Sequence, residues 1–270
     1  MENYSVLMTV YKKDNPNYVK QGIDSMLEQT VLTNDFVLVC DGPLTPELDK
    51  LIERYVAENG SIFNVIRMKK NVGLGAALRH GLPLCKNRLV ARMDDDDVAY
   101  PDRCEKELKF YEDHQDVSIL GSYVTEFESR IDNAIREKEV PTDMSSIITF
   151  SKRRNPFNHS TVMIDKDKIL AVGNYSEMRT NQDVELWVRA LNSGLIGANL
   201  PESLVYFRFD NDTYKRRKDL KNVKLMVQVW KEFYKKGYCG LSDFLMVSIM
   251  QYGVAFAPTK MIQWAYDHLR

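Results

Sequence analysis

Strand-like and helix-like segments alternate between residues 5 and 93 of this 270-residue chain. Short apolar runs typical of buried strands are separated by segments whose apolar residues recur at helical spacing. We expect strands at 5–11, 36–40, 61–68 and 88–93, and helices at 17–28, from Pro46 onward and at 76–84. Such alternation favours an α/β fold with a Rossmann-like, mostly parallel central sheet flanked by helices.

After residue 101 the alternation weakens. We expect a helix at 101–112, a strand at 117–124, an irregular polar excursion at 126–145, a strand at 161–164, a helix at 181–191, a strand at 204–209 and a basic amphipathic helix at 219–236. No internal repeat or obvious linker divides the chain. A single α/β unit followed by a helical tail is therefore the expected organisation.

Four consecutive aspartates, Asp94 to Asp97, follow the apolar run that ends at Met93. Carboxylates this close repel one another, so a bound cation would explain why they gather at the end of a strand. Asp41 likewise follows the strand at 36–40, and ligands of such sheets bind beyond the carboxyl ends of the strands. Hard oxygen ligands suit Mg²⁺ or Mn²⁺. A solvated acidic loop without a ligand is the alternative.

The formal charge of the chain is −1, which implies no bulk attraction to nucleic acid. Its distribution is uneven, because residues 207–270 carry 12 Lys and Arg against 6 Asp and Glu. This pattern fits an acidic body that holds metal, followed by a basic tail that binds phosphates or an anionic surface. The four cysteines form no CxxC pair, which argues against a zinc site and a disulfide framework. No secretory signal pattern opens the sequence, so a cytoplasmic location is expected.

Six short stretches carry a family resemblance: 5–11 (SVLMTVY), 40–43 (CDGP), 71–75 (NVGLG), 91–97 (ARMDDDD), 155–161 (NPFNHST) and 182–187 (QDVELW). In order and spacing they resemble the family 2 inverting glycosyltransferases of the GT-A fold, above all those that build bacterial capsules, O-antigens and exopolysaccharides. The resemblance implies transfer of a sugar from a nucleotide diphosphate, expected to be a UDP-sugar, to a hydroxyl of a glycan. A polyprenyl-diphosphate-linked sugar is the acceptor that it implies.

The resemblance identifies the aspartate run as the family's DxD motif, with Mn²⁺ or Mg²⁺ as the cofactor. A metal would help the negatively charged leaving group to depart. Asp96 would contact the metal, and Asp94 would contact the ribose or the metal shell. Asp95 counts with the donor-binding residues, with simple solvation as the alternative. Asp97, the usual trailing aspartate of the motif, would contact the metal ligands and not the metal itself.

Other donor-binding residues implied by the resemblance are Thr9, Tyr11, Asp41, Asn71 and Gly73. Asp41 would accept a hydrogen bond from the nucleobase, although Cys40 stands where the family commonly has a first acidic residue. A turn former before glycine is the alternative for Asp41. The glycines at 73 and 75 lack the third glycine of a dinucleotide fingerprint. They would let the backbone approach the nucleotide closely.

Three arginines are expected near the diphosphate, since arginine suits bidentate phosphate binding. Arg79 lies in the helix at 76–84, Arg92 precedes the aspartates, and Arg216 belongs to the basic cluster 214–217. That cluster would form a loop that closes over the diphosphate. Surface charges, helix-pairing charges or a solvated helix start are the alternatives.

An inverting transfer needs a base that deprotonates the acceptor hydroxyl. By resemblance Asp183 is this base, at the start of a helix, although Gln182 replaces the family's usual Glu. A first-turn acid favoured by the helix dipole is the alternative for Asp183. His159 and Trp187 would line the acceptor side, with a place in the core as the alternative for Trp187.

We expect a catalytic domain at 1–215, with a donor-binding half at 1–100 and an acceptor half at 101–215, and a C-terminal extension at 216–270. Residues 244–259 are apolar and uncharged, but too few for the roughly 20 needed to span a bilayer. This stretch would lie on the anionic inner leaflet of the membrane. Packing on the catalytic domain or in a homodimer is the alternative.

Two other functions compete with sugar transfer. A sugar-phosphate nucleotidyltransferase shares a related core, but it usually has a glycine-rich loop after the first strand, where this chain has no glycine. A catalytically inactive nucleotide- or metal-binding protein is the second alternative, and the departures at Cys40 and Gln182 are what favour it.

Overall fold

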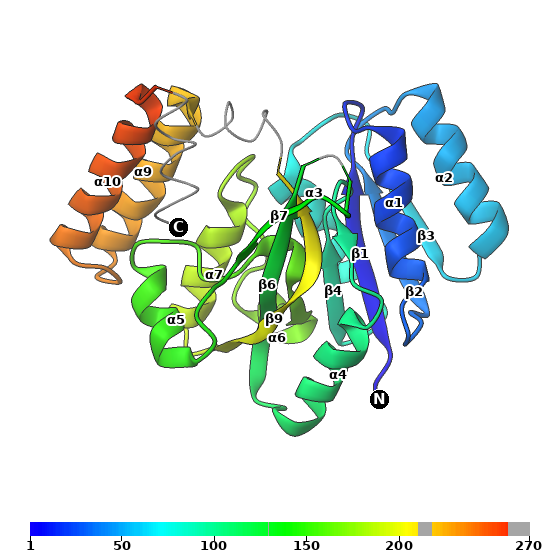
Figure 1. The fold of residues 1–270 in the computed structure, drawn as a ribbon, viewed down its shortest axis with the longest axis horizontal. Coiled ribbons are helices and arrows are strands. Elements are labelled where there is room, and N and C mark those ends of the chain that lie inside the picture. The colour runs from blue at the N-terminus through cyan, green and yellow to red at the C-terminus, as the bar shows by residue number, and fades with distance from the viewer. Residues whose placement is uncertain (129, 210–217, 259–270) are drawn as a thin grey trace.

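The computed structural model describes residues 1–128, 130–209 and 218–258, and there it forms an α/β sandwich around one mixed sheet (Figure 1). The strand order is β3-β2-β1-β4-β8-β6-β9-β5, with β7 paired to β6. The strands are β1 (Tyr4–Val10), β2 (Asp35–Cys40), β3 (Phe63–Arg67), β4 (Leu89–Met93), β5 (Val98–Ala99), β6 (Val117–Phe127), β7 (Ala134–Lys138), β8 (Met163–Asp165) and β9 (Ile196–Arg208).

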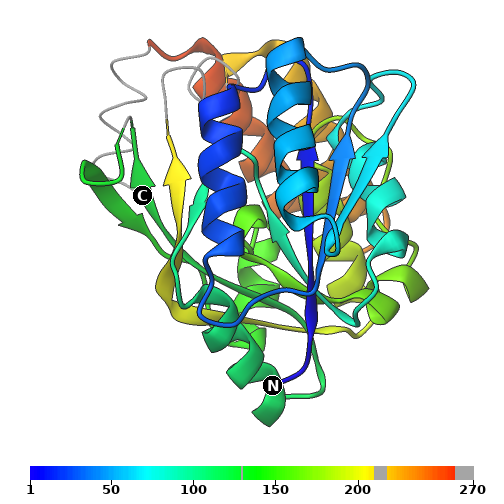
Figure 2. The same cartoon turned by 90° about the vertical axis from the view of Figure 1, so that its right-hand side faces the viewer.

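Helices cover both faces of the sheet, and Figure 2 shows two of them side by side over one face. Buried residues of α1, α2 and α4 join one apolar cluster, and those of α3, α5, α6 and α7 join the other. The helices are α1 (Pro16–Leu27), α2 (Pro46–Asn59), α3 (Leu74–Gly81), α4 (Arg103–Asp113), α5 (Met144–Ser151), α6 (Lys166–Ala171), α7 (Gln182–Asn192), α9 (Leu220–Lys235) and α10 (Leu241–Phe256).

The first four strands of the chain are all parallel, as their alternation with helices predicts. The second half departs from this pattern, because β8 pairs antiparallel with both β4 and β6. The expected mostly parallel α/β fold is confirmed. The excursion at 126–145 contains β7 and the start of α5, which the sequence did not indicate. β7 is short and mostly polar, and α5 has only eight residues, too few to show a clear helical period.

Strand register brings the candidate residues of the first half to one edge of the sheet. Met8 of β1 pairs with Met93 of β4, so Thr9 and Asp94 follow at the same level. Val10 pairs with Cys40, so Tyr11 and Asp41 follow at the same level one strand away. The candidate donor-binding residues therefore meet at the carboxyl edge, where such sheets bind their ligands.

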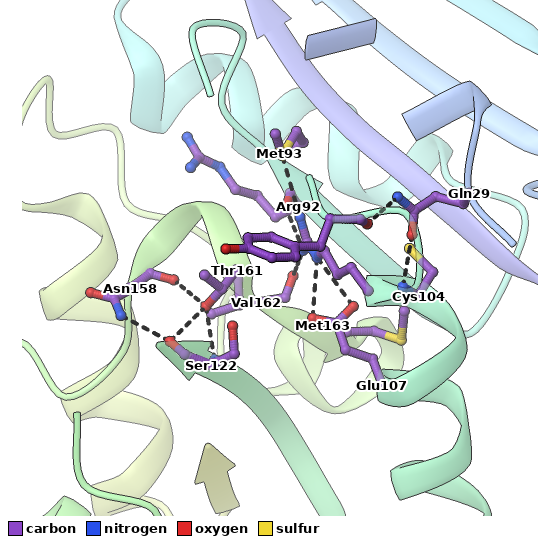
Figure 3. Close-up of polar contacts among 12 residues, drawn as sticks. Gln29, Arg92, Met93, Cys104, Glu107, Ser122, Asn158, Thr161, Val162 and Met163 are labelled. Carbon is purple, nitrogen blue, oxygen red and sulfur yellow. Dashed lines mark hydrogen bonds and ion pairs between the residues drawn. The ribbon is translucent and has the colours of Figure 1, made fainter. Parts of the chain in front are cut away.

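A buried ion pair supports β4 from α4 (Figure 3). The guanidinium of Arg103 donates to both carboxylate oxygens of Glu107, at 3.2 and 3.3 Å, and to the carbonyl oxygen of Arg92 at 2.9 Å. Both charged side chains are fully buried. Arg103 thereby fastens the backbone of β4 just before the aspartate run.

Helices α9 and α10 form a C-terminal hairpin that stands at the outer edge of the molecule (Figure 1). Val229, Trp230 and Phe233 of α9 pack with Val184 and Val188 of α7. The expected basic amphipathic helix is present as α9, and the apolar stretch forms most of α10. Among the helices described, none is long and apolar enough to cross a membrane.

Candidate active site

The guanidinium of Arg92 forms an ion pair with the carboxylate of Asp94. Arg92 lies in β4 with only 1% of its side chain exposed. Burial works against its charge, but the Asp94 carboxylate holds the pKa of Arg92 above its usual value. Nε and Nη1 of Arg92 have no hydrogen-bond partner among the described residues. A buried guanidinium with free donors is suited to an anionic or hydroxyl-rich ligand.

The other aspartates of the run are crowded by negative charge. Burial and the neighbouring carboxylates, Asp14 foremost, raise the pKa of Asp95 well above its ordinary range. Burial, together with Asp96 and Asp94, likewise raises the pKa of Asp97. At the carboxyl edge of β4, burial and mutual repulsion therefore disfavour full ionisation of these carboxyl groups.

Asp14 is a member of this cluster that the sequence did not indicate. Its carboxylate accepts a 2.6 Å hydrogen bond from the backbone amide of Tyr11 and shares a hydrogen bond with Asp95. Burial raises the pKa of Asp14 to about 6. No motif marks this residue, and only its place just after β1 could have suggested that it reaches the same edge.

The chemistry of this edge fits a hard divalent cation such as Mn²⁺ or Mg²⁺. Carboxylate oxygens are the ligands that these ions prefer, and a cation would relieve the repulsion that raises the pKa of Asp95. Within 1–128, 130–209 and 218–258, however, no three His, Cys, Asp or Glu side chains are grouped so as to hold a metal. Mg²⁺ in proteins is commonly held by one or two carboxylates together with substrate phosphates and water.

Arg208, at the end of β9, holds the aspartate turn from the other side. Its backbone amide donates to the Asp97 carboxylate at 2.8 Å, and its Nε donates to the carbonyl oxygen of Asp96 at 2.9 Å. The guanidinium stacks 3.7 Å from the ring centre of Tyr18 on α1. Asp97 is buried by these contacts. Asp97 supports the turn through its hydrogen bond from the Arg208 amide, and its expected role behind the metal ligands stays a prediction.

The carboxylate of Asp41 organises the glycine loop before α3. It accepts hydrogen bonds from Asn71 Nδ2 at 2.8 Å and from the backbone amides of Val72 and Gly73 at 2.7 and 2.9 Å. Gly73 has φ +99°, a conformation that favours glycine. Asp41 is thus bound to the chain on both oxygens, which leaves about one of its four lone-pair positions for a nucleobase.

Arg179 lies beside this loop and was not indicated by the sequence. Its guanidinium donates to the Asn71 side-chain oxygen at 2.8 Å. A Cβ at Gly73 would lie 2.7 Å from Arg179 Cγ, so the missing side chain makes room for this arginine. An exposed cation therefore stands next to two of the expected donor-binding residues, Asn71 and Gly73.

Of the other two arginines expected near the diphosphate, Arg79 lies within the described residues and Arg216 does not. Arg79 lies in the last turn of α3, where its guanidinium donates to the carbonyl oxygens of Gly173 and Tyr175, both at 2.8 Å. The structure does not bring it to the carboxyl edge. Arg216, with the rest of the basic cluster 214–217, lies outside the described residues.

Asp183 lies in the first turn of α7, where its carboxylate accepts a 2.6 Å hydrogen bond from Asn155 Nδ2. Burial raises the pKa of Asp183, and the charge of Arg92 acts in the opposite direction. A carboxylate with a raised pKa is a stronger base, as proton abstraction requires. The charge of Arg92, which pairs with Asp94, therefore also reaches Asp183, although burial and the hydrogen bonds of Asp183 affect its pKa more.

Trp187 is fully buried, so it supports the site from the core and does not offer a face to a sugar. Its ring centre lies 5.9 Å from that of His159 and 6.3 Å from that of Tyr175. His159 Nε2 is hydrogen-bonded to the Tyr175 hydroxyl at 3.1 Å. Burial and the nearby Arg92 charge hold the pKa of His159 well below its usual value, so its ring is neutral at neutral pH.

The loop that carries His159 is fixed to β6 by a small polar network (Figure 3). Asn158 Nδ2 donates to the carbonyl oxygen of Ser122 at 2.8 Å, and the Thr161 hydroxyl donates to the carbonyl oxygen of Asn158 at 2.8 Å. The 155–161 stretch therefore holds a fixed shape beside Asp183.

The chain belongs to glycosyl transferase family 2, since the model of that family matches residues 5–173. It is therefore a glycosyltransferase, and the expected family and enzyme class are confirmed. The nucleotidyltransferase alternative is set aside by the same match.

Three relatives match nearly the whole chain. It is 36% identical over 266 residues to the UDP-Gal:alpha-D-GlcNAc-diphosphoundecaprenol beta-1,3-galactosyltransferase of Escherichia coli, with 97% of this chain and 94% of that protein covered. It is 32% identical to the amylovoran biosynthesis glycosyltransferase AmsE of Erwinia amylovora, with 98% of each covered. It is 34% identical to an uncharacterized glycosyltransferase of Haemophilus influenzae, with 98% and 97% covered.

Two solved structures share the fold. The mannosyltransferase PcManGT from Pyrobaculum calidifontis, in complex with GDP-Man and Mn²⁺, matches with a TM-score of 0.66 and 13% identity over 100% of this chain and 76% of its own. Residues 1–349 of S. aureus TarS, in complex with UDP-GlcNAc, match with a TM-score of 0.66 and 16% identity over 98% and 79%. At these identities the likeness establishes the fold alone.

Proposed function

We propose that this glycosyltransferase is metal-dependent and inverting, and that it moves a sugar from a UDP-sugar to a hydroxyl of a polyprenyl-diphosphate-linked glycan. The observation that carries the proposal is the shared buried Arg92, which pairs with Asp94 and also acts on Asp183. The charge of one buried cation thus reaches both a donor-binding carboxylate and the carboxylate proposed as the base. A single bound sugar would then face both.

On the donor side, the chain's own residues bind and orient the nucleotide. The Asp41-ordered loop at 71–73 would lie against the nucleobase and ribose, with Arg179 beside it. Thr9 and Tyr11 belong to the same edge. Asp96, with Asp94, would hold Mn²⁺ or Mg²⁺, which when bound neutralises charge on the departing diphosphate. The N–H groups of Arg92 Nε and Nη1, which have no partner among the described residues, would hydrogen-bond to the nucleotide sugar.

On the acceptor side, Asp183 would accept the proton of the acceptor hydroxyl as its oxygen bonds to the anomeric carbon. The bond from that carbon to the diphosphate oxygen breaks at the opposite face, which inverts the configuration. Asn155 holds the Asp183 carboxylate in place, and the 155–161 loop with His159 lines the same side. Preorganisation of this kind keeps the base aimed at the incoming hydroxyl.

The relatives support the choice of substrates and pathway. The Escherichia coli protein acts, by its name, with UDP-galactose on a diphosphoundecaprenol-linked acceptor, and the Erwinia amylovora protein works in amylovoran biosynthesis. We place this chain in cell-surface polysaccharide biosynthesis at the cytoplasmic face of the membrane. In this proposal residues 1–215 form the catalytic domain and residues 216–270 form an extension that faces the acceptor's lipid.

The test uses the purified full chain with UDP-, GDP- and dTDP-sugars and a synthetic diphosphate-linked GlcNAc acceptor carrying a short, water-soluble alkyl chain. We expect transfer from one UDP-sugar, loss of transfer on addition of EDTA, and recovery with Mn²⁺ or Mg²⁺. Nuclear magnetic resonance of the product should show an inverted anomeric centre. Tight nucleotide binding without transfer or hydrolysis of any donor would favour the catalytically inactive alternative.

A further inference from the structure

Helix α10 carries an apolar face that the rest of the described protein leaves uncovered. Ile249 is 72% exposed and Phe256 is 74% exposed, although both are large hydrophobic side chains. The remaining exposed members of this face are Leu241, Leu245, Met246, Met250 and Tyr252. No Asp, Glu, Lys or Arg follows Asp243 in the helix. Contiguous exposed apolar residues of this kind mark an interaction surface.

The apolar face of α10 is exposed although the α9–α10 hairpin is bound to the catalytic body by hydrogen bonds and apolar contacts. Trp230 Nε1 donates to the carbonyl oxygen of Lys152 at 2.8 Å. Arg153 Nε donates to the Asp243 carboxylate at 2.6 Å. Val247 is the buried contact of α10 within the cluster shared with α7 and α9. These contacts fix the orientation of α10, so that its apolar face points away from the catalytic body.

The charge of the hairpin distinguishes between a lipid surface and a second copy of the chain. Residues 218–258 contain six lysines and three acidic residues. Packing two copies through α10 would bring two positively charged hairpins together, whereas an anionic lipid surface would attract each of them. A helix that combines an apolar face with basic neighbours is typical of proteins that lie in the membrane interface.

We infer that the face of α10 formed by Leu241, Leu245, Met246, Ile249, Met250, Tyr252 and Phe256 lies in the surface of an anionic lipid bilayer. The inference deepens the proposed function and rests on it for the acceptor. Because α9 packs on α7, the helix that carries Asp183, the base is fixed relative to this face. A diphosphate-linked sugar at the lipid surface would then be presented to the acceptor side.

Flotation of the full chain with vesicles tests the inference. Vesicles of phosphatidylcholine alone are compared with vesicles that contain one part phosphatidylglycerol to three parts phosphatidylcholine. We expect the wild type to bind the anionic vesicles and to be released by high salt. The double variant Ile249→Gln/Phe256→Gln should bind roughly a hundredfold more weakly, because two large side chains no longer enter the apolar phase. Leu32→Gln, which changes a side chain that is 69% exposed elsewhere, is the matched control.

Two further measurements separate the outcomes. Transfer to the short-chain acceptor should be the same in the wild type and the double variant, so loss of vesicle binding with intact transfer supports the inference. Size-exclusion chromatography with light scattering reports the oligomeric state. Failure of the wild type to bind anionic vesicles, equal binding by the double variant, or a dimer that this variant dissociates would each overturn the inference. Absence of transfer by every variant would overturn only the proposed function.

Discussion

The side-chain amide of Asn155 donates a 2.6 Å hydrogen bond to the carboxylate of Asp183. The two residues come from different segments, since Asn155 follows α5 and Asp183 lies in the first turn of α7. The bond favours the ionised form of Asp183, whereas burial raises its pKa. Asn155 therefore lowers the pKa of Asp183, against the effect of burial, and fixes the orientation of its carboxylate.

Replacing Asn155 tests this relationship through the pH dependence of transfer. The base works only when it is deprotonated, so the rate falls as the pH drops through the pKa of Asp183. Because that pKa is raised, the acid limb of the wild type should lie above the ordinary range of an aspartate. In Asn155→Ala the limb should move to higher pH, and kcat should fall about tenfold or more from lost orientation. An unchanged acid limb would contradict the assignment of Asp183 as the base.

Asp183→Asn should lower kcat by about 10²–10⁴-fold, the usual contribution of general-base catalysis. Affinity for UDP, measured by calorimetry with Mn²⁺, should stay the same, because the base contacts the acceptor. Glu185→Gln, two residues further along the same helix and paired with Arg189, is a suitable control. A large loss of UDP affinity in Asp183→Asn would place this residue on the donor side.

Asp96→Asn should abolish metal-dependent transfer and leave the fold intact. Removing one charge relieves repulsion in the aspartate run, where burial and, after it, the neighbouring carboxylates raise the pKa of Asp95 and Asp97. The melting temperature without metal should therefore be equal to or higher than that of the wild type. Stabilisation by Mn²⁺ with UDP, read from the same melting curves, should disappear. Full transfer by this variant at saturating Mn²⁺ would rule out the metal assignment.

Much of the donor half follows from local sequence signals. The apolar runs predict β1 to β4, and α2 begins at the expected Pro46, with the side chain of Thr45 accepting from the Leu48 amide. Strands β1, β2 and β4 are buried and helices separate the four strands, so the spacing of apolar residues and the turn residues predict these elements. The position of Asp41 and the aspartate run at one edge then follows from parallel pairing.

The residues that join the two halves could not be found in this way. Asp14, Arg179 and Arg208 reach the site through loops and strand ends whose positions depend on packing between distant segments. Arg79 shows the converse, because its helix was expected correctly but its guanidinium is held by carbonyl groups nearly 100 residues away in sequence. The direction of a long side chain is decided by tertiary contacts that no local pattern encodes.

Gly75 lets the loop before Asp183 lie against α3, and this contact can be tested by adding one methyl group. A Cβ at Gly75 would lie 2.3 Å from the carbonyl oxygens of both Ser176 and Met178. Gly75→Ala should therefore displace that loop, destabilise the protein by about 1–3 kcal/mol and reduce transfer. Gly253→Ala, in α10 with no atom within 4 Å of the added Cβ, should instead stabilise by about 0.5–1 kcal/mol. Urea unfolding of both variants measures the difference.

The buried pair of Arg103 and Glu107 gives a prediction in which the effect of a mutation depends on pH. Burial raises the pKa of Glu107 from its ordinary 4.5 to about 7, with Arg103 acting in the opposite direction. A carboxyl whose pKa is raised by folding stabilises the fold while it is protonated, and this contribution is lost as the pH rises through about 7.

Arg103→Met removes the partner and leaves Glu107 buried. At pH 8 we expect a loss of about 3–5 kcal/mol, because an ionised carboxylate would remain uncompensated in the core. At pH 5 the loss should be clearly smaller, since Glu107 can stay protonated there at little cost. The double variant Arg103→Met/Glu107→Leu should recover most of the stability at pH 8, as replacing both charges by apolar groups is often neutral or stabilising. Urea unfolding at the two pH values decides between this account and one in which Arg103 acts only through the Arg92 carbonyl, for which the loss would be the same at both.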